Sequence, residues 1–374
     1  MADNPAFIPV NEPLLNGNEK KYLNECIDTG WISSEGPFIR EFEEKFSKRC
    51  HRTHGIAVSN GSVALDAAVM ALDLEKGSEV IMPAFTIISC AAAIVRAGLV
   101  PVLVDADPVT WNMNVHDIEK KITSKTKAIM VVHIYGLPVD MDPVLKLART
   151  NGLKIIEDAA EMHGQTYKGR PCGSFGDISI FSFYPNKHIT TGEGGMIVTD
   201  NEELAEKCRS LRNLCFMPMR RFVHETLGYN FRMTNLQAAL GLAQLERLDE
   251  FVIRKRNMGR LYNELLVNLQ GFQGPSAYAG TDENIYWVYG LVSLDKGRDA
   301  ISCMKQLANA GVGTRPFFYP MHLQPVFQRM GLFKGESYPV AEMLAEQGFY
   351  IPSGMALTED QIREVARRLQ AEFA

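Results

Sequence analysis

The residue types around Lys187 and Asp158 could together perform amine chemistry. Lys187 follows a strand-like run from Asp177 to Phe183, and Asp158 ends an earlier apolar run. Pyridoxal phosphate needs such a pair, because an amine must condense with its aldehyde and a carboxylate must keep its pyridine nitrogen protonated. We therefore predict that Lys187 and Asp158 are catalytic residues on either side of one cofactor ring.

The alternative interpretation is that Lys187 is a surface lysine and that Asp158 caps a strand, since lysines are mostly exposed. The surroundings favour the functional interpretation. Asp158 follows Leu153–Glu157, which is typical of a buried parallel strand, and functional groups in α/β sheets gather at the carboxyl ends of such strands. Beyond the lysine, Gly192–Gly195 permit a tight turn before another strand.

Length and composition indicate an ordinary globular protein with two domains. The chain has 374 residues, of which 46% are hydrophobic and 22% charged, and its net charge is −5. Acidic and basic residues are interspersed, so neither nucleic acid nor an anionic membrane surface is an expected partner. We place the domain boundary near residue 250, which gives a large domain of residues 1–250 and a small domain of residues 251–374.

Cysteine use and the absence of targeting patterns predict a cytoplasmic location. The seven cysteines are scattered and never spaced as Cys-x-x-Cys, which argues against a disulfide framework or a zinc site. His51 and His54 lack the neighbouring carboxylate motif of a metal site, so no metal is expected. The first residues do not form a signal sequence, and no apolar run is long enough to span a bilayer.

Short β-rich runs alternate with helical stretches from His54 to Asp158, which predicts a mostly parallel sheet covered by helices on both faces. The expected strands are Gly55–Val58, Glu79–Met82, Val100–Val104, Ala128–Val132 and Lys154–Ile156. The expected helices are Ser62–Leu72, Ile87–Ala97, Val115–Lys121 and Met141–Asn151.

The remaining part of the chain predicts a smaller α+β unit. Apolar spacing indicates a helix from Asn235 to Val252, with Thr234 as its N-cap, and a second helix from about Lys255 to Leu269. After these we expect a strand at Tyr286–Leu294, a helix at Asp299–Ala310 and a last helix opened by the capping-box spacing of Thr358–Gln361.

Asn60-Gly61-Ser62 lies at an expected strand-to-helix junction, where free backbone N–H groups and a positive partial charge favour phosphate. Gly61 would let the backbone approach the phosphate closely, and Ser62 would add a hydroxyl. The alternative is a plain turn, which is common for these residue types.

Several long motifs in order resemble the DegT/DnrJ/EryC1/StrS sugar aminotransferases, a branch of the fold-type I pyridoxal phosphate enzymes. The matching segments are Gly30–Ser34, Asn60–Leu65, Glu157–Glu161, Ser182–Gly195 and Gly228–Ala239. The resemblance implies a large domain with a mostly parallel seven-stranded sheet, a smaller α+β C-terminal domain, pyridoxal 5′-phosphate as cofactor and transamination as the activity.

The resemblance also implies roles for individual residues. Gly61, Ser62 and Ser182 match phosphate ligands, Phe85 the aromatic residue that stacks on the ring, and Glu161 the residue near its 3′-oxygen, where many relatives have Gln. From sequence alone, Phe85 could equally be an ordinary core residue. Asn230 matches a residue that reaches the phosphate of the neighbouring subunit, which implies a homodimer with shared active sites.

Substrate recognition is inferred by the same resemblance. The residues that it assigns to the substrates are Trp31, Ser33, Arg232, Arg315 and His322. Arg232 could pair with a carboxylate through its guanidinium, and His322 could bind sugar hydroxyls or cap a loop. Gly30–Ser34 and Arg315–His322 are most similar to enzymes that aminate GDP-4-keto-6-deoxymannose with L-glutamate.

Two alternatives are kept for the activity. The keto sugar could be linked to UDP or dTDP instead of GDP, or the protein could be a sugar 3-dehydratase of the same family. In those dehydratases a histidine replaces the lysine, whereas this chain has Lys187, followed by His188.

Overall fold

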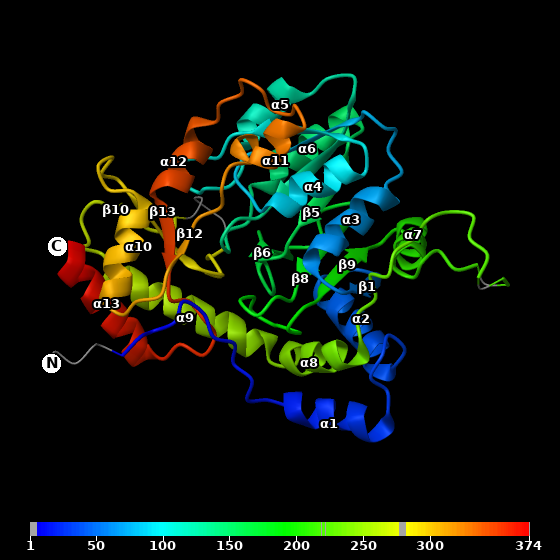
Figure 1. Cartoon of the computed structure of the whole chain (residues 1–374), viewed down its shortest axis with the longest axis horizontal. Helices are drawn as coiled ribbons and strands as arrows, with labels where there is room; N and C mark the ends of the chain where they lie inside the picture. The colour runs from blue at the N-terminus through cyan, green and yellow to red at the C-terminus, as the bar shows by residue number, and fades with distance from the viewer. Residues whose placement is uncertain (1–5, 218, 221, 277–281, 374) are drawn as a thin grey trace.

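The computed structural model describes residues 6–217, 219–220, 222–276 and 282–373 (Figure 1). Its N-terminal part is built on a seven-stranded sheet with the order β1-β9-β8-β5-β4-β2-β3. These strands are β1 (His54–Val58), β2 (Glu79–Pro83), β3 (Val100–Val104), β4 (Thr126–Val132), β5 (Lys154–Asp158), β8 (Ile178–Ser182) and β9 (Gly195–Thr199). The predicted seven-stranded sheet is therefore confirmed.

The sheet is mostly parallel, as expected. Five consecutive strands, from β8 to the edge strand β3, pair in parallel, and only β9 runs antiparallel to its neighbours β8 and β1. Because β4, β5 and β8 point the same way, their carboxyl ends meet at one edge. Asp158 ends β5 and Ser182 ends β8, so both predicted site residues lie at this edge.

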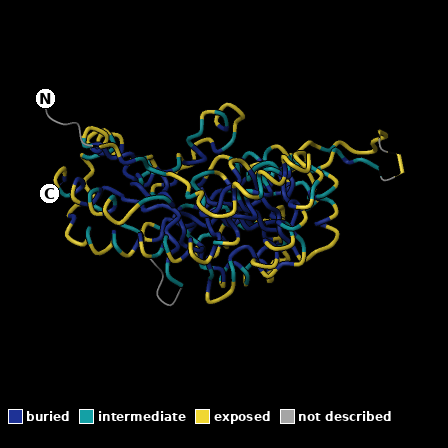
Figure 2. The backbone as a smooth tube through the Cα atoms, turned by 90° about the horizontal axis from the view of Figure 1, so that it is seen from below, coloured by how far each residue is buried: buried dark blue, intermediate teal, exposed yellow. Residues whose placement is uncertain are grey.

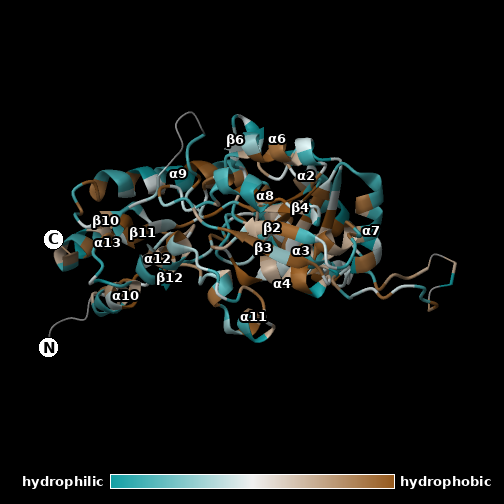
Figure 3. Ribbon diagram, turned by 90° about the horizontal axis from the view of Figure 1, so that it is seen from above, coloured by the Kyte–Doolittle hydropathy of each residue, from teal (hydrophilic) through white to brown (hydrophobic). Residues whose placement is uncertain are grey.

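Helices cover both faces of the sheet and bury its apolar side chains in two clusters. One cluster includes residues of α3 (Gly61–Ala71), α4 (Ile88–Arg96) and α7 (Glu202–Arg212). The other includes residues of α2 (Pro37–Arg49), α6 (Met141–Asn151) and α8 (Asn235–Leu245). Figure 3 shows apolar and polar stripes along single helices, as expected for helices with one buried face.

The predicted helix from Asn235 to Val252 is two helices. The capping box between Thr234 and Gln237 is present, but α8 ends at Leu245 and α9 spans Leu248–Leu265. Arg247 interrupts the helix with φ −109° and ψ 9°. The apolar spacing continues across this break, because both helices bury a face, and periodicity therefore did not reveal it.

The C-terminal part is a small α+β unit, as predicted, around a four-stranded antiparallel sheet of order β10-β11-β13-β12. These strands are β10 (Phe272–Gln273), β11 (Tyr289–Ser293), β12 (Arg315–Pro316) and β13 (Gly348–Ile351), with α10 (Ala300–Asn309) and α13 (Glu359–Phe373) packed against them. Thr358 and Gln361 form the expected capping box of α13. The boundary at residue 250 falls within α9 and stays a prediction.

The predicted helix Val115–Lys121 is present as η1 (Val115–Asp117) followed directly by α5 (Ile118–Lys121). Other elements were not predicted: α1 (Glu19–Thr29), β6 (Thr166–Tyr167), β7 (Arg170–Pro171), η2 (Met321–Leu323), α11 (Pro325–Arg329) and α12 (Pro339–Gln347). Among the described residues, no helix combines the length and the apolar character needed to cross a membrane.

An arm projects from the molecule after α7 (Figures 1 and 2). We use this name for the described residues of 213–230, which leave out 218 and 221; its two ends are joined by a β-bridge between Asn213 and Asn230. Met219 is 92% exposed and Leu227 is 89% exposed, so large apolar side chains face away from the rest of the chain.

Candidate active site

A cavity of about 900 Å3 opens at the carboxyl ends of β5 and β8. The predicted residues that line it are Gly61, Ser62, Asp158, Glu161, Ser182 and Lys187. Lys187 lies on the loop between β8 and β9. Its backbone N–H donates a hydrogen bond to the carbonyl oxygen of Tyr184, which closes a turn in this loop. The structure thus brings the predicted amine and carboxylate to one cavity.

The side chain of Lys187 is only 10% exposed, so its amine is largely shielded from water. Its Nζ lies 3.5 Å from Oε1 of Glu161 and 3.7 Å from the centroid of the Trp287 ring. Burial lowers the pKa of Lys187, while the charges of Glu161 and Asp158 oppose this change. A lowered pKa increases the neutral fraction of the amine, which is the form that can bond to a carbonyl carbon or accept a proton.

Asp158 is buried, and its two oxygens have separate donors. Oδ1 accepts the N–H of Ala160 at 3.0 Å, and Oδ2 accepts the thiol of Cys90 at 3.3 Å. Burial raises the pKa of Asp158, although these hydrogen bonds and the charge of Lys187 favour its ionised form. Its carboxyl group can therefore hold a proton shared with a ring nitrogen in the cavity.

Glu161 is positioned by the loop that follows β5. Its Oε2 accepts the N–H of Tyr135 at 2.7 Å, which leaves Oε1 toward Lys187. Burial raises the pKa of Glu161 to about 7, against the opposing effects of the Lys187 charge and the Tyr135 N–H. Glu161 can therefore be protonated or ionised near neutral pH.

The start of α3 also lines the cavity. Asn60 is its N-cap and accepts the N–H of Val63 at 3.0 Å, while Ser62 Oγ lies 2.7 Å from Ser89 Oγ at the start of α4. A Cβ on Gly61 would lie 2.7 Å from Ser182 Cβ. The glycine therefore keeps open a space between a helix N-terminus and serine hydroxyls, as phosphate binding requires.

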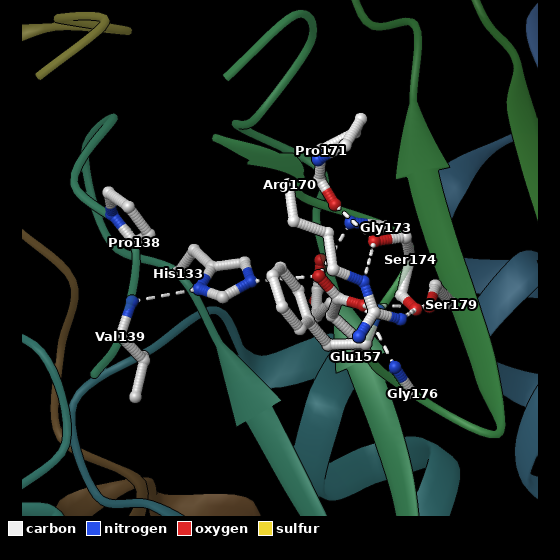
Figure 4. A network of polar contacts seen from close by, with 12 residues as sticks. His133, Pro138, Val139, Glu157, Arg170, Pro171, Gly173, Ser174, Gly176 and Ser179 are labelled. Carbon is white, nitrogen blue, oxygen red and sulfur yellow. Dashed lines mark hydrogen bonds and ion pairs between the residues drawn. The ribbon is translucent and has the colours of Figure 1, made fainter. Parts of the chain in front are cut away.

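A network of hydrogen bonds surrounds Glu157, the residue that precedes Asp158 in β5 (Figure 4). Glu157 is fully buried and accepts hydrogen bonds from the N–H groups of Gly173, Phe175 and Gly176, from Ser179 Oγ, and from His133 at 3.1 Å. His133 in turn accepts the N–H of Val139. Burial alone would raise the pKa of Glu157, but these donors lower it to about 2. The carboxylate thus ties β4, β5 and β8 together beside the site.

Phe85 is fully buried and packs edge-on or tilted against the rings of Tyr135, Phe317 and Phe318. It is not among the residues that line the cavity, so its stacking on the cofactor ring stays a prediction beside the core alternative. Ile87, the N-cap residue of α4, is 42% exposed and lines the cavity.

Four predicted residues lie outside this cavity. Arg232 lines a second cavity of about 450 Å3 together with Asn213, to whose Oδ1 it donates a hydrogen bond of 2.7 Å. Trp31 and Ser33 are exposed nearby and accept hydrogen bonds from Asn235 at the start of α8. Asn230 is exposed at the base of the arm. Within one chain, the structure does not bring these residues to Lys187.

The two C-terminal candidates are separated. Arg315 is exposed and pairs in the sheet with Tyr350, a residue that lines the Lys187 cavity, so Arg315 lies near its rim. His322 is 1% exposed, and its Nε2 lies 2.9 Å from Oε1 of Glu342. Its ring packs on Tyr338, away from the cavity lining. Nδ1 of His322 is buried without a hydrogen-bond partner among the described residues, so both predicted roles of His322, sugar binding and loop capping, stay predictions.

Sequence reasoning missed several residues that line the cavity. Trp287, Phe318 and Tyr350 come from the C-terminal part of the chain, and Ser89 comes from the first turn of α4. The aromatic residues carry no local signal of a site, because their approach depends on how the two sheets pack. Ser89 could have been found as a second serine at the start of a helix that follows a parallel strand.

The residues of this cavity fit pyridoxal phosphate. The cavity is bordered by the buried amine of Lys187, by the buried carboxyl group of Asp158 and by the hydroxyl-lined start of α3, where a Cβ on Gly61 would fill the space. The fold and this site define a pyridoxal phosphate-dependent aminotransferase of fold type I. Residues 13–370 match the DegT/DnrJ/EryC1/StrS aminotransferase family, and the chain belongs to this family.

Comparison with individual relatives gives finer detail. The chain is 43% identical to a GDP-perosamine synthase of Escherichia coli O157:H7, over 95% of this chain and 96% of the relative. It is also 43% identical to a GDP-perosamine synthase of Caulobacter vibrioides, over 99% of both chains. A putative pyridoxal phosphate-dependent aminotransferase of Bacillus subtilis, EpsN, is 35% identical over 95% of this chain and 92% of the relative.

Among solved structures, the chain is similar to DesI, determined in the presence of its TDP-sugar product. The TM-score is 0.86 at 31% identity, and the match covers 99% of this chain and 93% of DesI. The similarity to solved structures therefore extends over both sheets, including the C-terminal part that contributes Trp287 and Tyr350.

Proposed function

We propose that this protein transfers an amino group from L-glutamate to C4 of GDP-4-keto-6-deoxymannose and so forms GDP-perosamine. The observation that carries the chemistry is the buried Lys187 beside Glu161 in the cavity that Asp158 also lines. The choice of GDP sugar is supported by the two GDP-perosamine synthases at 43% identity over nearly the whole chain.

Lys187 would move the protons of both half-reactions. When bound, pyridoxal phosphate supplies the carbonyl that accepts the donor's nitrogen and an electron sink for the donor's Cα. In the first half-reaction, Lys187 Nζ would accept the α-proton of glutamate, and the donor would leave as an oxo acid. In the second half-reaction, Lys187 Nζ would supply a proton to the sugar carbon that receives the amine. The lowered pKa of Lys187 suits both directions.

Other residues would bind and orient. Asp158 would hold the proton of the ring nitrogen, and Gly61, Ser62 and Ser182 would hold the phosphate at the start of α3. Glu161 would keep the released amine of Lys187 within hydrogen-bond reach. Arg315, near the rim, would meet the nucleotide-linked sugar.

The experiment is a glutamate-dependent amination assay with GDP-, UDP- and dTDP-linked 4-keto-6-deoxy sugars, followed by mass spectrometry of the products. We expect a clear preference for the GDP sugar and no turnover by Lys187→Ala. A preference for the dTDP sugar would instead support the alternative to which DesI and its TDP-sugar product point. Unchanged activity of Lys187→Ala would exclude the proposed chemistry altogether.

We further propose a homodimer whose partner completes each site. The arm supports this, because Met219 and Leu227 expose apolar surface that a second copy could cover. Asn230, at the base of the arm, and the arginine-lined cavity with Arg232 lie on the same part of the chain. In such a dimer Asn230 would reach the partner's phosphate, and Trp31, Ser33 and Arg232 would approach the partner's substrate.

Sedimentation at several protein concentrations tests this proposal. Leu227→Asp should weaken the dimer, whereas Val267→Asp changes an apolar residue that is 74% exposed in the turn after α9 and serves as the matched control. A monomeric and fully active wild-type protein would contradict the proposal. We also propose that the enzyme works in the cytoplasm, because its seven cysteines are buried and unpaired, as expected in a reducing compartment.

A further inference from the structure

The indole group of Trp287 contacts Lys187 at two points. Nζ of Lys187 lies 3.7 Å from the centroid of the indole ring. The indole Nε1 donates a hydrogen bond of 2.8 Å to the carbonyl oxygen of Asn186, in the peptide group that leads to Lys187. The ring therefore meets the end of the lysine side chain, and its N–H holds the backbone from which that side chain starts.

Trp287 is itself fixed by three other parts of the fold. It is 4% exposed, and its carbonyl oxygen accepts a hydrogen bond of 2.8 Å from Nζ of Lys255 on α9. Its ring stacks on Tyr135 at 5.8 Å between centroids, with Tyr350 at 6.3 Å. A buried aromatic side chain with these neighbours has one orientation, so the contact with Lys187 exists before any ligand arrives.

This contact should change both the charge and the place of the amine. A cation over the face of Trp is attracted by the ring, and the attraction is larger when the pair is shielded from water. The titratable groups that act on Lys187 are Asp158, Glu161, His163 and His188. The indole carries no titratable group, so its attraction persists at every pH at which the ammonium form exists.

We propose that Trp287 is a positioning residue for Lys187. The face of the Trp287 ring receives the Lys187 amine each time the amine is released, and the Trp287 N–H fixes the loop that carries Lys187. This inference rests on the proposed function, because only a lysine that is bound and released during turnover needs such a resting place. Lys255 supports the arrangement by holding the Trp287 backbone, and it also donates to the carbonyl oxygen of Ser353.

The first test measures how fast the cofactor-depleted protein captures added pyridoxal phosphate, followed by visible absorption across a pH series. Capture requires the neutral amine, so its rate rises with pH around the pKa of Lys187. In Trp287→Met the midpoint should fall by about one pH unit, because the ammonium form loses the ring. Trp287→Phe keeps a weaker ring face and should shift the midpoint less.

The matched control is Trp111→Phe. Trp111 is also buried and packs on Tyr135 and Phe317, but it does not line the cavity. Its substitution should leave the capture midpoint unchanged. An unchanged or raised midpoint in Trp287→Met would overturn the inference, since a raised midpoint would mean that admitted water matters more than the lost ring.

The second test uses turnover with ordinary and α-deuterated L-glutamate. Trp287→Phe should lower kcat about 10- to 100-fold with little change in KM, because a misplaced base slows the proton transfer and not binding. The deuterium isotope effect on kcat should increase in the same variant. A lower kcat without a larger isotope effect would count against positioning. Failure of the wild-type protein to turn over with glutamate would contradict the proposed function, and the capture midpoints would still decide the role of Trp287.

Discussion

Nζ of Lys187 lies 3.5 Å from Oε1 of Glu161, and both side chains are almost fully buried. Each group changes the ionisation of the other, because the Lys187 charge opposes the rise in the pKa of Glu161 and the Glu161 charge opposes the fall in that of Lys187. At this position a glutamate, unlike a glutamine, makes the site sensitive to pH near neutrality.

Glu161→Gln should remove a pH-dependent loss of stability. The folded pKa of Glu161 is about 7, above the usual 4.5, so its contribution to stability is fully present below pH 4.5 and is lost as the pH rises through 7. In urea unfolding of the cofactor-free protein, the variant should therefore gain roughly 1–3 kcal/mol relative to wild type between pH 5 and pH 8. A difference that stays constant over this range would show that Glu161 does not have a raised pKa.

Gly61→Ala should close the space proposed for the phosphate. The added Cβ would lie 2.7 Å from Ser182 Cβ, so the start of α3 or the end of β8 must move. We expect the dissociation constant for pyridoxal phosphate, measured by absorption, to rise at least about 10-fold, which corresponds to about 1.4 kcal/mol. Gly274→Ala is the control, because its Cβ would meet only the Tyr289 hydroxyl group, at 3.3 Å. Equal affinities in both variants would contradict the assignment.

Phe85 and Ile87 should have opposite phenotypes. Phe85→Leu leaves a gap among buried aromatic rings, so it should reduce the free energy of unfolding by about 1–3 kcal/mol without altering the absorption of the bound cofactor. Ile87→Ala should cost less stability but change the position of the cofactor's absorption band, because Ile87 lines the cavity. If Phe85→Leu alone shifted the band, the original stacking prediction would be right.

Glu157→Gln should be strongly destabilising at neutral pH. The amide would turn a donor toward groups that all donate to the carboxylate, at a cost of about 2–4 kcal/mol. Since the folded pKa of Glu157 is about 2, its contribution is present above pH 4.5 and is lost as the pH falls toward 2. The difference from wild type should therefore shrink in denaturation experiments near pH 3. Ser179→Ala, which removes one donor, should cost only about 1 kcal/mol.

The sequence predicted the features that depend on local pattern. Asp158 and Lys187 could be found because apolar runs mark buried strands, and because residues at the ends of parallel strands meet in space. Phe85 and Ile87 could not be distinguished, since side-chain direction beyond a strand depends on the following turn. Trp287 and Tyr350 could not be assigned at all, because packing between the two sheets brings them to the site.

Helix α9 belongs to both halves of the molecule. Near its start Leu248 and Phe251 are buried in the core of the seven-stranded sheet, and further along Met258 and Tyr262 are buried in the core of the four-stranded sheet. A helix of this length is about 27 Å long, so the two halves can swing apart only if apolar residues of one core are exposed to water or the helix bends. We therefore expect substrates to enter through rearrangements of loops and side chains rather than through a hinge between the two halves.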